Sequence, residues 1–317
     1  MRGLRYNRVT MRHVMLFALI SLLLAGCRPE ASAGWGTAVP EGDALSYAYA
    51  TQTSALQEPA TAQTAPSPSP TEDTRLKPED WQDWPVIPDA TGTARALYRQ
   101  GIAMGNDPHA FSKVGDCQNV RTAFLGFFDR PGWYEQMSDM EPLEDTIANF
   151  KGHFNRDGQA TQFGFTAASV LSPMMADPDI CLPDENPLEC ELRITRPTFV
   201  LISLEFPFLG RTEGLYERYM RQIIEYTMAQ GAVPILATKA DNVEKDHSIN
   251  LTTARLAYEY DLPLWNWWAA AQTLGNKGID PYRDDGLNFH ITEQAWNVRS
   301  KTFLQTLDHL WESLRED

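Results

Sequence analysis

Apolar and polar positions along residues 81–317 change their spacing in a regular way, and each spacing predicts one kind of element. Short, largely apolar stretches predict strands buried in a sheet, and they lie at residues 111–115, 198–204 and 233–238. Between them, apolar residues recur three and four positions apart, which predicts amphipathic helices. These helices are expected over residues 94–104, 143–150, 214–230, 251–260 and 292–314.

The order of these elements predicts an α/β fold in which a parallel sheet is covered by helices on both faces. Strands that are separated by helices of ten or more residues run parallel, and ligand sites in such sheets lie at the carboxyl ends of the strands. Cys117, Glu205 and Asp241 each follow a predicted strand, and His290 precedes the last helix. We therefore expect these side chains to meet at one edge of a single domain.

The first 27 residues have a pattern of their own. Four arginines precede an apolar stretch at residues 14–24, which is shorter than the roughly 20 residues of a membrane span, so it predicts an export signal. The stretch ends in Leu24-Ala25-Gly26-Cys27, which resembles the lipobox of bacterial lipoproteins, where the cysteine is lipidated and becomes the mature N-terminus. An ordinary cleaved signal and an uncleaved anchor are the alternatives.

Residues 28–80 show no apolar periodicity and are rich in Ala, Thr, Ser, Gln and Pro. A segment of this composition buries too little surface to offset its chain entropy, so it predicts a disordered tether. The domain is then expected to span residues 81–317. A lipid on Cys27 would hold this domain in the cell envelope, on the extracytoplasmic face of the membrane.

The chain is strongly acidic, with a formal net charge of −15. Residues 1–26 carry four arginines and no acidic residue, so their removal would leave the rest of the chain at −19. Such a charge argues against a nucleic-acid partner and against direct binding to anionic lipid. We therefore expect the membrane contact to come from the lipid on Cys27. The protein is expected to be a monomer.

The four cysteines can be assigned one by one for an oxidising compartment. Cys27 would carry the lipid, and Cys181 and Cys190 lie nine residues apart in a stretch with two prolines. That spacing predicts a disulfide that closes a loop, with two separate buried thiols as the alternative. No second Cys or His pair has metal-ligand spacing, and no nucleotide-binding or metal motif is present, so neither metal nor cofactor is expected. Cys117 is left as a thiol.

The segment Gly115-Asp116-Cys117, the alternation of strands and helices and a late acidic segment that ends in His290 together resemble the SGNH (GDSL) hydrolase superfamily. The resemblance covers most of residues 94–317. It implies a three-layer, flavodoxin-like α/β/α fold and hydrolysis of esters. In that family a serine in Gly-Asp-Ser is the nucleophile, a loop glycine and an asparagine help to form the oxyanion hole, and a late Asp-x-x-His supplies acid and base.

This sequence departs from the family pattern in three places. Cys117 stands where the family has its serine. Glu205 and Pro207 stand where the family has Gly-x-Asn-Asp. An oxyanion donor, typically worth about 10²–10³ in rate, is therefore missing. Glu205 also places a negative charge near the position where the negative oxyanion would form. Asp285 and His290 are five residues apart instead of three, which fits the family only if the loop is two residues longer.

The resemblance leaves two functions open. One is hydrolysis of acyl or acetyl esters of envelope or extracellular carbohydrate or lipid, with Cys117 as nucleophile, His290 as base and Asp285 as its orienting acid, because a deprotonated thiol is a competent nucleophile. Gly164 would then be either an oxyanion donor or an ordinary turn residue. The other function is that of a binding protein that kept the cleft and lost turnover.

Three further groups of residues have two interpretations each. Trp265, Trp267 and Trp268 form either a platform for a sugar or part of the core, since the strand around them leads into a helix. The polar residues after the third strand either line the cleft or belong to a solvated loop, and they are Lys239, Asp241 and Asn242. Their polarity favours the solvated loop. The isolated histidines are expected at the surface or at helix ends, and they are His109, His153 and His247.

Overall fold

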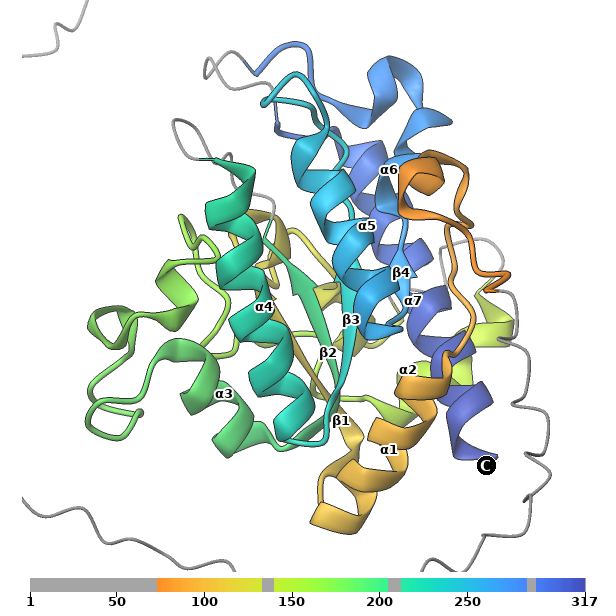
Figure 1. Ribbon diagram of the computed structural model, residues 1–317. Coiled ribbons are helices and arrows are strands. Elements are labelled where there is room, and N and C mark those ends of the chain that lie inside the picture. Colours follow the sequence, from red (N-terminus) through yellow and green to blue (C-terminus); the bar gives the residue numbers. More distant parts are fainter. Residues whose placement is uncertain (1–72, 133–139, 205–211, 284–288, 317) are drawn as a thin grey trace, which may run out of the picture. The chain divides into compact units, whose positions relative to one another are not determined.

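The computed structural model describes residues 73–132, 140–204, 212–283 and 289–316 (Figure 1). A parallel sheet lies at the centre of this part of the chain, which confirms the predicted α/β fold. Its strands follow one another in the order of the sequence. They are β1 (Asp107–Gly115), β2 (Pro197–Ser203), β3 (Val233–Ala237) and β4 (Leu264–Trp265).

The register of the strands aligns their carboxyl ends. Gly115 at the end of β1 pairs with Ser203 at the end of β2, and Ala237 of β3 pairs with Trp265 of β4. On the other side of β1, Gly115 forms a parallel bridge with Thr161, supported by hydrogen bonds to the backbone on either side of that residue. The end of β1 is therefore held on both sides, directly before the segment that contains Cys117.

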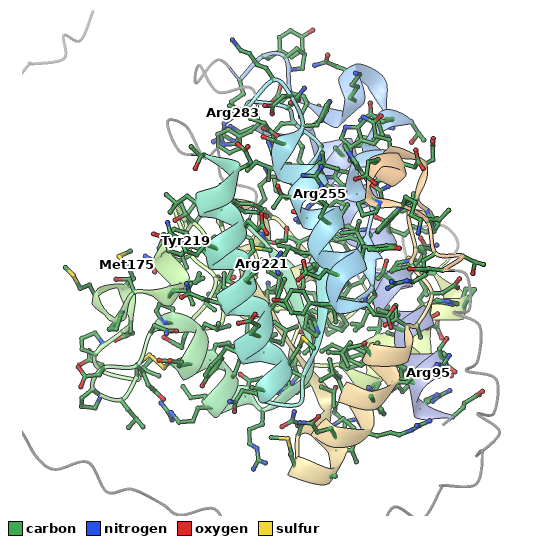
Figure 2. The ribbon with its side chains drawn as sticks, viewed as in Figure 1. Arg95, Met175, Tyr219, Arg221, Arg255 and Arg283 are labelled. Atoms are coloured by element: carbon green, nitrogen blue, oxygen red, sulfur yellow. A yellow bond between two sulfur atoms is a disulfide. The ribbon has the colours of Figure 1, made fainter. Side chains whose placement is uncertain are left out.

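Helices cover both faces of the sheet. One face is covered by α3 (Pro187–Thr195), α4 (Glu213–Ala229) and α5 (Ser248–Tyr260), of which α4 and α5 lie in front of the strands in Figure 1. The other is covered by α1 (Gly92–Met104) and α7 (Glu293–Arg315), with α2 (Glu144–Asn149) packed against α7. The helix α6 (Trp267–Gln272) follows β4. On the surface, Arg221 of α4 bonds to Glu259 of α5 (Figure 2).

Short 3-10 helices connect these elements. They are η1 (Pro78–Asp83), η2 (Cys117–Asn119), η3 (Gly126–Asp129), η5 (Glu141–Leu143), η6 (Ser169–Leu171), η7 (Pro173–Met175) and η8 (Gly275–Gly278). Within the described ranges, no helix is both long enough and apolar enough to cross a membrane.

The core on the α7 face is built from aromatic rings. Phe111 of β1 meets Phe150 edge-on at 5.8 Å between ring centroids, and it also contacts Phe154 and Phe303. Edge-to-face contacts of this kind add about 0.5–1.5 kcal/mol each to the burial of the rings. Phe303 belongs to α7, so this cluster fixes the last helix against the first strand.

The structure confirms all five predicted helices and adds two α-helices outside those ranges, α3 and α6. We expected a loop between Cys181 and Cys190, and the disulfide between them is present. However, the residues from Pro187 onward form α3, which begins with a capping box made by Asn186 and Glu189. The loop prediction was wrong here because a proline is compatible with the first position of a helix, where its missing N–H is not needed.

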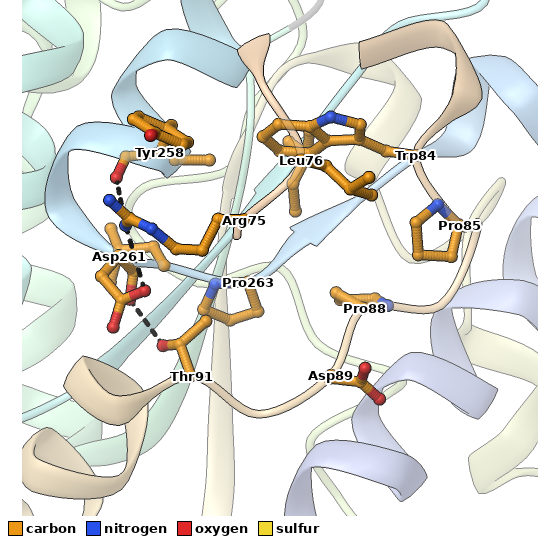
Figure 3. A pocket seen from close by; sticks show the side chains of 13 residues that line it. Arg75, Leu76, Trp84, Pro85, Pro88, Asp89, Thr91, Tyr258, Asp261 and Pro263 are labelled. Carbon is orange, nitrogen blue, oxygen red and sulfur yellow. Dashed lines mark hydrogen bonds and ion pairs between the residues drawn. The ribbon is translucent and has the colours of Figure 1, made fainter. Parts of the chain in front are cut away.

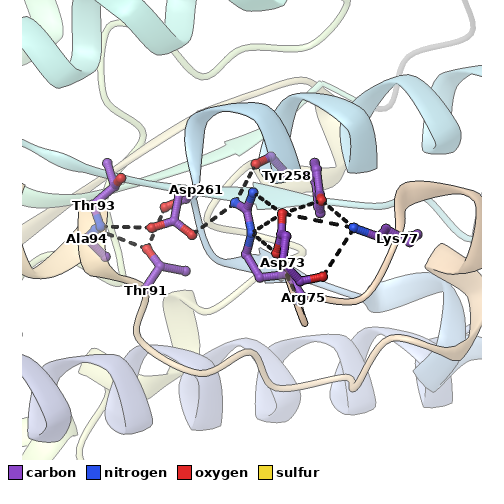
Figure 4. Close-up of polar contacts among 8 residues, drawn as sticks. All are labelled: Asp73, Arg75, Lys77, Thr91, Thr93, Ala94, Tyr258 and Asp261. Carbon is purple, nitrogen blue, oxygen red and sulfur yellow. Dashed lines mark hydrogen bonds and ion pairs between the residues drawn. The ribbon is translucent and has the colours of Figure 1, made fainter. Parts of the chain in front are cut away.

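The chain already packs against α5 before Trp81, where the domain was expected to begin. The guanidinium of Arg75 donates a hydrogen bond to the backbone oxygen of Tyr258 at 2.9 Å and lies 4.1 Å from the centre of the Tyr258 ring (Figure 4). Asp73 pairs with Arg75 and accepts a hydrogen bond from the Tyr258 hydroxyl. These exposed contacts direct the N-terminal segment along the end of α5.

A buried carboxylate joins α3 to β1. Glu191 accepts hydrogen bonds from the Ser112 hydroxyl at 2.5 Å and from the Gln159 backbone at 2.7 Å, and it forms an ion pair with Arg156. Burial alone would raise the pKa of Glu191, but Arg156 and the hydrogen bonds outweigh burial and lower it. A buried charge is stable only when it is paired in this way.

We expect Glu191→Ala to lower the free energy of unfolding by about 3–5 kcal/mol, because the change breaks a buried ion pair and leaves its partners unsatisfied. Urea unfolding monitored by tryptophan fluorescence measures the loss. Glu312→Ala is the control, since it removes an exposed ion pair with Arg315 that should be worth less than about 1 kcal/mol. Equal losses in the two variants would contradict this account of α3.

Candidate active site

The turn after β1 presents Cys117 at the carboxyl edge of the sheet. The buried carboxylate of Asp116 accepts a hydrogen bond from the Gln118 backbone at 2.9 Å and so caps η2. A side chain at position 115 would overlap the side chain of Asn119, so the turn requires Gly115. Cys117 itself is half-buried and forms no disulfide with another described residue.

His290 lies in a short extended segment before α7. Its backbone oxygen accepts a hydrogen bond from the Asp280 backbone at 2.9 Å, and Ile291 next to it pairs with Ile279. The imidazole is half-buried, and its centre lies 4.1 Å from the centre of the Phe289 ring. This segment is therefore held by backbone pairing on the side that faces residues 279–280.

One hydrogen bond connects the two segments. The side-chain amide of Gln118 donates to the backbone oxygen of Phe289 at 3.2 Å. Gln118 directly follows Cys117, and Phe289 directly precedes His290. The structure therefore brings the predicted nucleophile and the predicted base to the same edge of the sheet, although they are far apart in the sequence.

Three other predicted site residues need separate statements. Asp285 and Glu205 lie outside the described residues. The role of Asp285 as the acid that orients His290 therefore stays a prediction, and so does the negative charge of Glu205 near the oxyanion. Gly164 is exposed and has a φ of 79°, a conformation that glycine adopts without steric cost. This backbone conformation is enough to explain why a glycine stands there, and its role as an oxyanion donor also stays a prediction.

Arg299 of α7 is part of this site, although its role was not predicted from the sequence. Its side chain is fully buried and donates hydrogen bonds to the Gln118 backbone oxygen at 2.8 Å, to Asn119 Oδ1 at 3.2 Å and to Ser203 Oγ at 3.0 Å. The guanidinium also lies 4.1 Å from the centre of the Phe124 ring. Arg299 thus joins the turn that carries Cys117 to the end of β2.

A signal for Arg299 is nevertheless present in the sequence. Residues 295, 299 and 303 are four positions apart and share one face of α7, and Ala295 and Phe303 on that face are fully buried. An arginine between two buried apolar positions is a candidate for a buried, paired charge, since a charged residue is rarely buried without partners.

The residues after β3 are buried, so the interpretation as a solvated loop was wrong for Lys239 and Asp241. The ammonium of Lys239 donates to Asp241 Oδ1 at 2.5 Å and also pairs with Glu244. Asn250 holds the backbone of Lys239 through two hydrogen bonds. Burial raises the pKa of Asp241 to about 6 even though Lys239 lowers it. These charges are buried because they neutralise one another.

The three tryptophans have different environments. Trp265 and Trp267 are fully buried in the core, whereas Trp268 is half-buried at the start of α6. Two histidines behave as ordinary structural residues, because exposed His109 contacts Asn149 and His153 contacts a backbone oxygen of β1. His247 is different, since its ring contacts the rings of both Trp81 and Trp268. Trp268 and His247 are thus in contact with each other, and both are half-buried.

An apolar pocket of about 220 Å³ lies elsewhere, between the N-terminal segment and the end of α5 (Figure 3). Leu76, Trp84 and Pro263 help to line it. Pro263 directly precedes β4, so this pocket lies at the amino ends of the strands. Cys117 follows the carboxyl end of β1, at the opposite edge, and the pocket is not part of the candidate active site.

No protein-family model and no curated protein sequence matches this chain. Its backbone is similar to that of the psychrotrophic esterase EstA from Pseudoalteromonas sp., with a TM-score of 0.43 and 15% identity over 65% of this chain and 98% of that chain. A GDSL-like lipase from Bacteroides thetaiotaomicron has a TM-score of 0.40 and 13% identity over 68% of this chain and 97% of that chain. For a mutant of an acetyl-xylooligosaccharide esterase from Geobacillus, the TM-score is 0.40 and the identity 14%, over 62% of this chain and 93% of that chain. Similarities at this level assign no activity to this chain.

We expect Arg299→Met to lower the free energy of unfolding by about 3 kcal/mol or more, because it leaves buried acceptors on the Cys117 turn and on β2 without their donor. The looser turn should also make native Cys117 react faster with iodoacetamide. Both effects are measured on the purified protein, by urea unfolding and by mass spectrometry of the alkylated peptide.

Arg255→Met is the matched control for this prediction, because Arg255 is exposed and its ion pair with Glu79 is long, at 3.9 Å. It should change the free energy of unfolding by less than about 1 kcal/mol and leave the alkylation rate as it is. An Arg299 variant that behaves like this control would show that the guanidinium does not hold the turn.

Proposed function

We propose that this protein is a carboxylic-ester hydrolase of the SGNH type, in which Cys117 replaces the usual serine. Its substrates would be acyl or acetyl esters of carbohydrate or lipid in the cell envelope or outside the cell. The observation that carries the proposal is the hydrogen bond from Gln118 to the Phe289 backbone, because it joins the segment of the thiol to the segment of His290. The Gly115-Asp116-Cys117 motif supports the same assignment.

The proposed reaction has two steps. His290 takes the proton of the Cys117 thiol, and Sγ attacks the ester carbonyl carbon. The carbon–oxygen bond to the alcohol then breaks, the alcohol leaves with the proton from His290, and a thioester remains on Cys117. In the second step His290 takes a proton from water, the hydroxide attacks the thioester, and the acid leaves while the thiol regains its proton. Asp285 would orient the imidazole throughout.

The proposed enzyme should be slow. Pro207 has no N–H to donate, and the family's asparagine is missing, so the Gly164 N–H and the backbone of the Cys117 turn would be the remaining candidates to stabilise the oxyanion. A missing donor typically costs about 10²–10³ in rate. Slow turnover is therefore part of the proposal.

A binding protein without turnover is the second candidate function. The observation in its favour is the sequence at Glu205 and Pro207, which replaces an oxyanion donor by a negative charge and a residue without N–H. In that case the cleft would hold an ester or glycan, and the thiol would have no catalytic role.

Cys117→Ala and His290→Ala distinguish the two functions. If the protein is a thiol esterase, each change should lower the hydrolysis of 4-nitrophenyl acetate by about 100-fold or more, since the first removes the nucleophile and the second the general base. Alkylation of Cys117 should also accelerate as pH rises through a depressed thiol pKa, and it should slow when His290 is removed.

His109→Ala is the control for a histidine substitution, because His109 is exposed and contacts Asn149 away from Cys117. It should retain the wild-type rate. Equal hydrolysis by wild type and Cys117→Ala would exclude the thiol-esterase mechanism and leave the binding function.

We further propose that Cys27 carries a diacylglycerol and anchors the protein to the membrane on its extracytoplasmic face. The Leu24-Ala25-Gly26-Cys27 sequence supports this proposal. Intact-mass analysis of membrane-extracted protein should show that residues 1–26 are removed and that a diacylglycerol is attached, and Cys27→Ser should lose both changes. A soluble product cleaved at another position would refute lipid anchoring.

A further inference from the structure

A groove of about 630 Å³ lies at the carboxyl ends of β3 and β4, on the same edge of the sheet as Cys117. A volume of this size is within the range of small-molecule sites. Its walls come from the loop after β3, the start of α6, and η8 with the residues that follow it. The lining residues used below are Asp241, Lys245, His247, Trp268, Lys277 and Asp280.

The groove adjoins the candidate active site. Asp280 lines the groove, and its backbone N–H donates to the backbone oxygen of His290 at 2.9 Å. One wall of the groove is therefore hydrogen-bonded to the segment that carries the predicted base. A ligand in contact with Asp280 would therefore be one backbone hydrogen bond away from the His290 segment.

Trp268 provides a fixed aromatic surface in this groove. Its backbone N–H donates to Thr238 Oγ1 at 2.9 Å. Its ring makes edge contacts with Trp81, at 4.9 Å between centroids, and with His247, at 5.9 Å. Because these contacts already hold the indole, a ligand that packs against it would lose little free energy in ordering the side chain.

Asp241 contributes a buried oxygen that lacks a hydrogen bond. Oδ1 accepts from Lys239 and from the Val243 backbone, whereas Oδ2 has no partner among the described residues, and 1% of the side chain is exposed. A buried acceptor without a partner costs about 1–3 kcal/mol. A hydroxyl group of a ligand in the groove would supply the missing donor.

The charges in the groove are balanced. Lys245 and Lys277 carry two positive charges, and Asp241 and Asp280 carry two negative ones when ionised. Burial lowers the pKa of His247 and so disfavours a positive charge on this ring. A groove with no net charge and with both donors and acceptors favours a neutral ligand that has many hydroxyl groups.

The backbone around the groove is strained. Among the described non-glycine residues, eight have positive φ, and Lys245, His247, Asn276 and Lys277 of the groove are four of them. Conformations of this kind cost free energy and concentrate at functional sites. The concentration of these residues in one groove agrees with a binding role.

From this indole, this buried acceptor and this balance of charge, we infer that the groove binds a neutral carbohydrate. A sugar ring packs one face on Trp268 and donates a hydroxyl to Asp241. The inference names the substrate class of the proposed esterase and in that respect rests on it, since the ester group of a bound glycan would lie beside Cys117 and His290. Binding itself requires no turnover, so the two proposals can fail separately.

The experiment measures glycan binding to full-length Cys117→Ala by isothermal titration calorimetry, so that hydrolysis does not interfere. The probes are the neutral β-1,4-linked tetrasaccharides of glucose, mannose, xylose and N-acetylglucosamine, with tetragalacturonate as an anionic comparison. We expect saturable binding of at least one neutral probe. Adding Trp268→Ala should weaken it about tenfold or more, and Trp268→Phe should restore part of the affinity.

Two more variants complete the experiment. Asp241→Asn keeps an oxygen for Lys239 and Val243 but replaces the unpartnered oxygen by an amide, and it should weaken binding about tenfold. This variant also tests the inference if Trp268→Ala does not fold. Trp84→Ala is the control, because Trp84 is half-buried in the pocket at the opposite edge of the sheet, and it should bind as the parent does.

The inference is overturned if no neutral tetrasaccharide binds, if only tetragalacturonate binds, or if folded variants at Trp268 and Asp241 bind as tightly as the parent. Glycan binding together with equal esterase rates for wild type and Cys117→Ala supports the inference and refutes the proposed function. Esterase activity that depends on Cys117, without any glycan binding, refutes the inference alone.

Discussion

The buried guanidinium of Arg299 is the interaction on which the candidate site depends. A cation in the core loses its hydration, so it is tolerated only where hydrogen-bond acceptors and aromatic faces surround it. Here these are supplied by the turn after β1, by the end of β2 and by the ring of Phe124. The requirement to satisfy one charge therefore fixes these parts of the chain relative to one another, and Cys117 lies on the first of them, the turn after β1.

Much of the fold could be predicted from the sequence, because the strands are buried on both faces and the helices on one. β2 and β3 appear as apolar stretches, and α4 and α7 as helical spacing. The exception, α3, has its cause in local chemistry. Pro187 resembles a loop residue when it is read alone, and it becomes the first residue of a helix only together with the capping pair that surrounds it.

The site was predictable to the extent that its chemistry is local. Gly115-Asp116-Cys117 marks the turn because glycine is required there and the aspartate caps it. The order of the elements predicted that His290 reaches this edge of the sheet. The hydrogen bond that connects the two segments was not predictable, since its acceptor is a backbone oxygen, and every residue has one. Lys239 and Asp241 were misread for a related reason: their polarity predicts exposure, and only the three-dimensional arrangement shows that they pair with each other.

The arrangement separates holding a ligand from reacting with it. The groove at β3 and β4 has a fixed indole and a buried acceptor, whereas Glu205 and Pro207 stand where the resemblance to SGNH hydrolases would place an oxyanion donor. Interactions that hold substrate and transition state equally lower KM and leave kcat unchanged. A protein with strong groove contacts and a weak oxyanion hole would therefore bind its glycan well and turn it over slowly. The two proposed functions, esterase and binding protein, would then differ in one quantity, the stabilisation of charge beside Cys117, and the proposed glycan groove would be common to both.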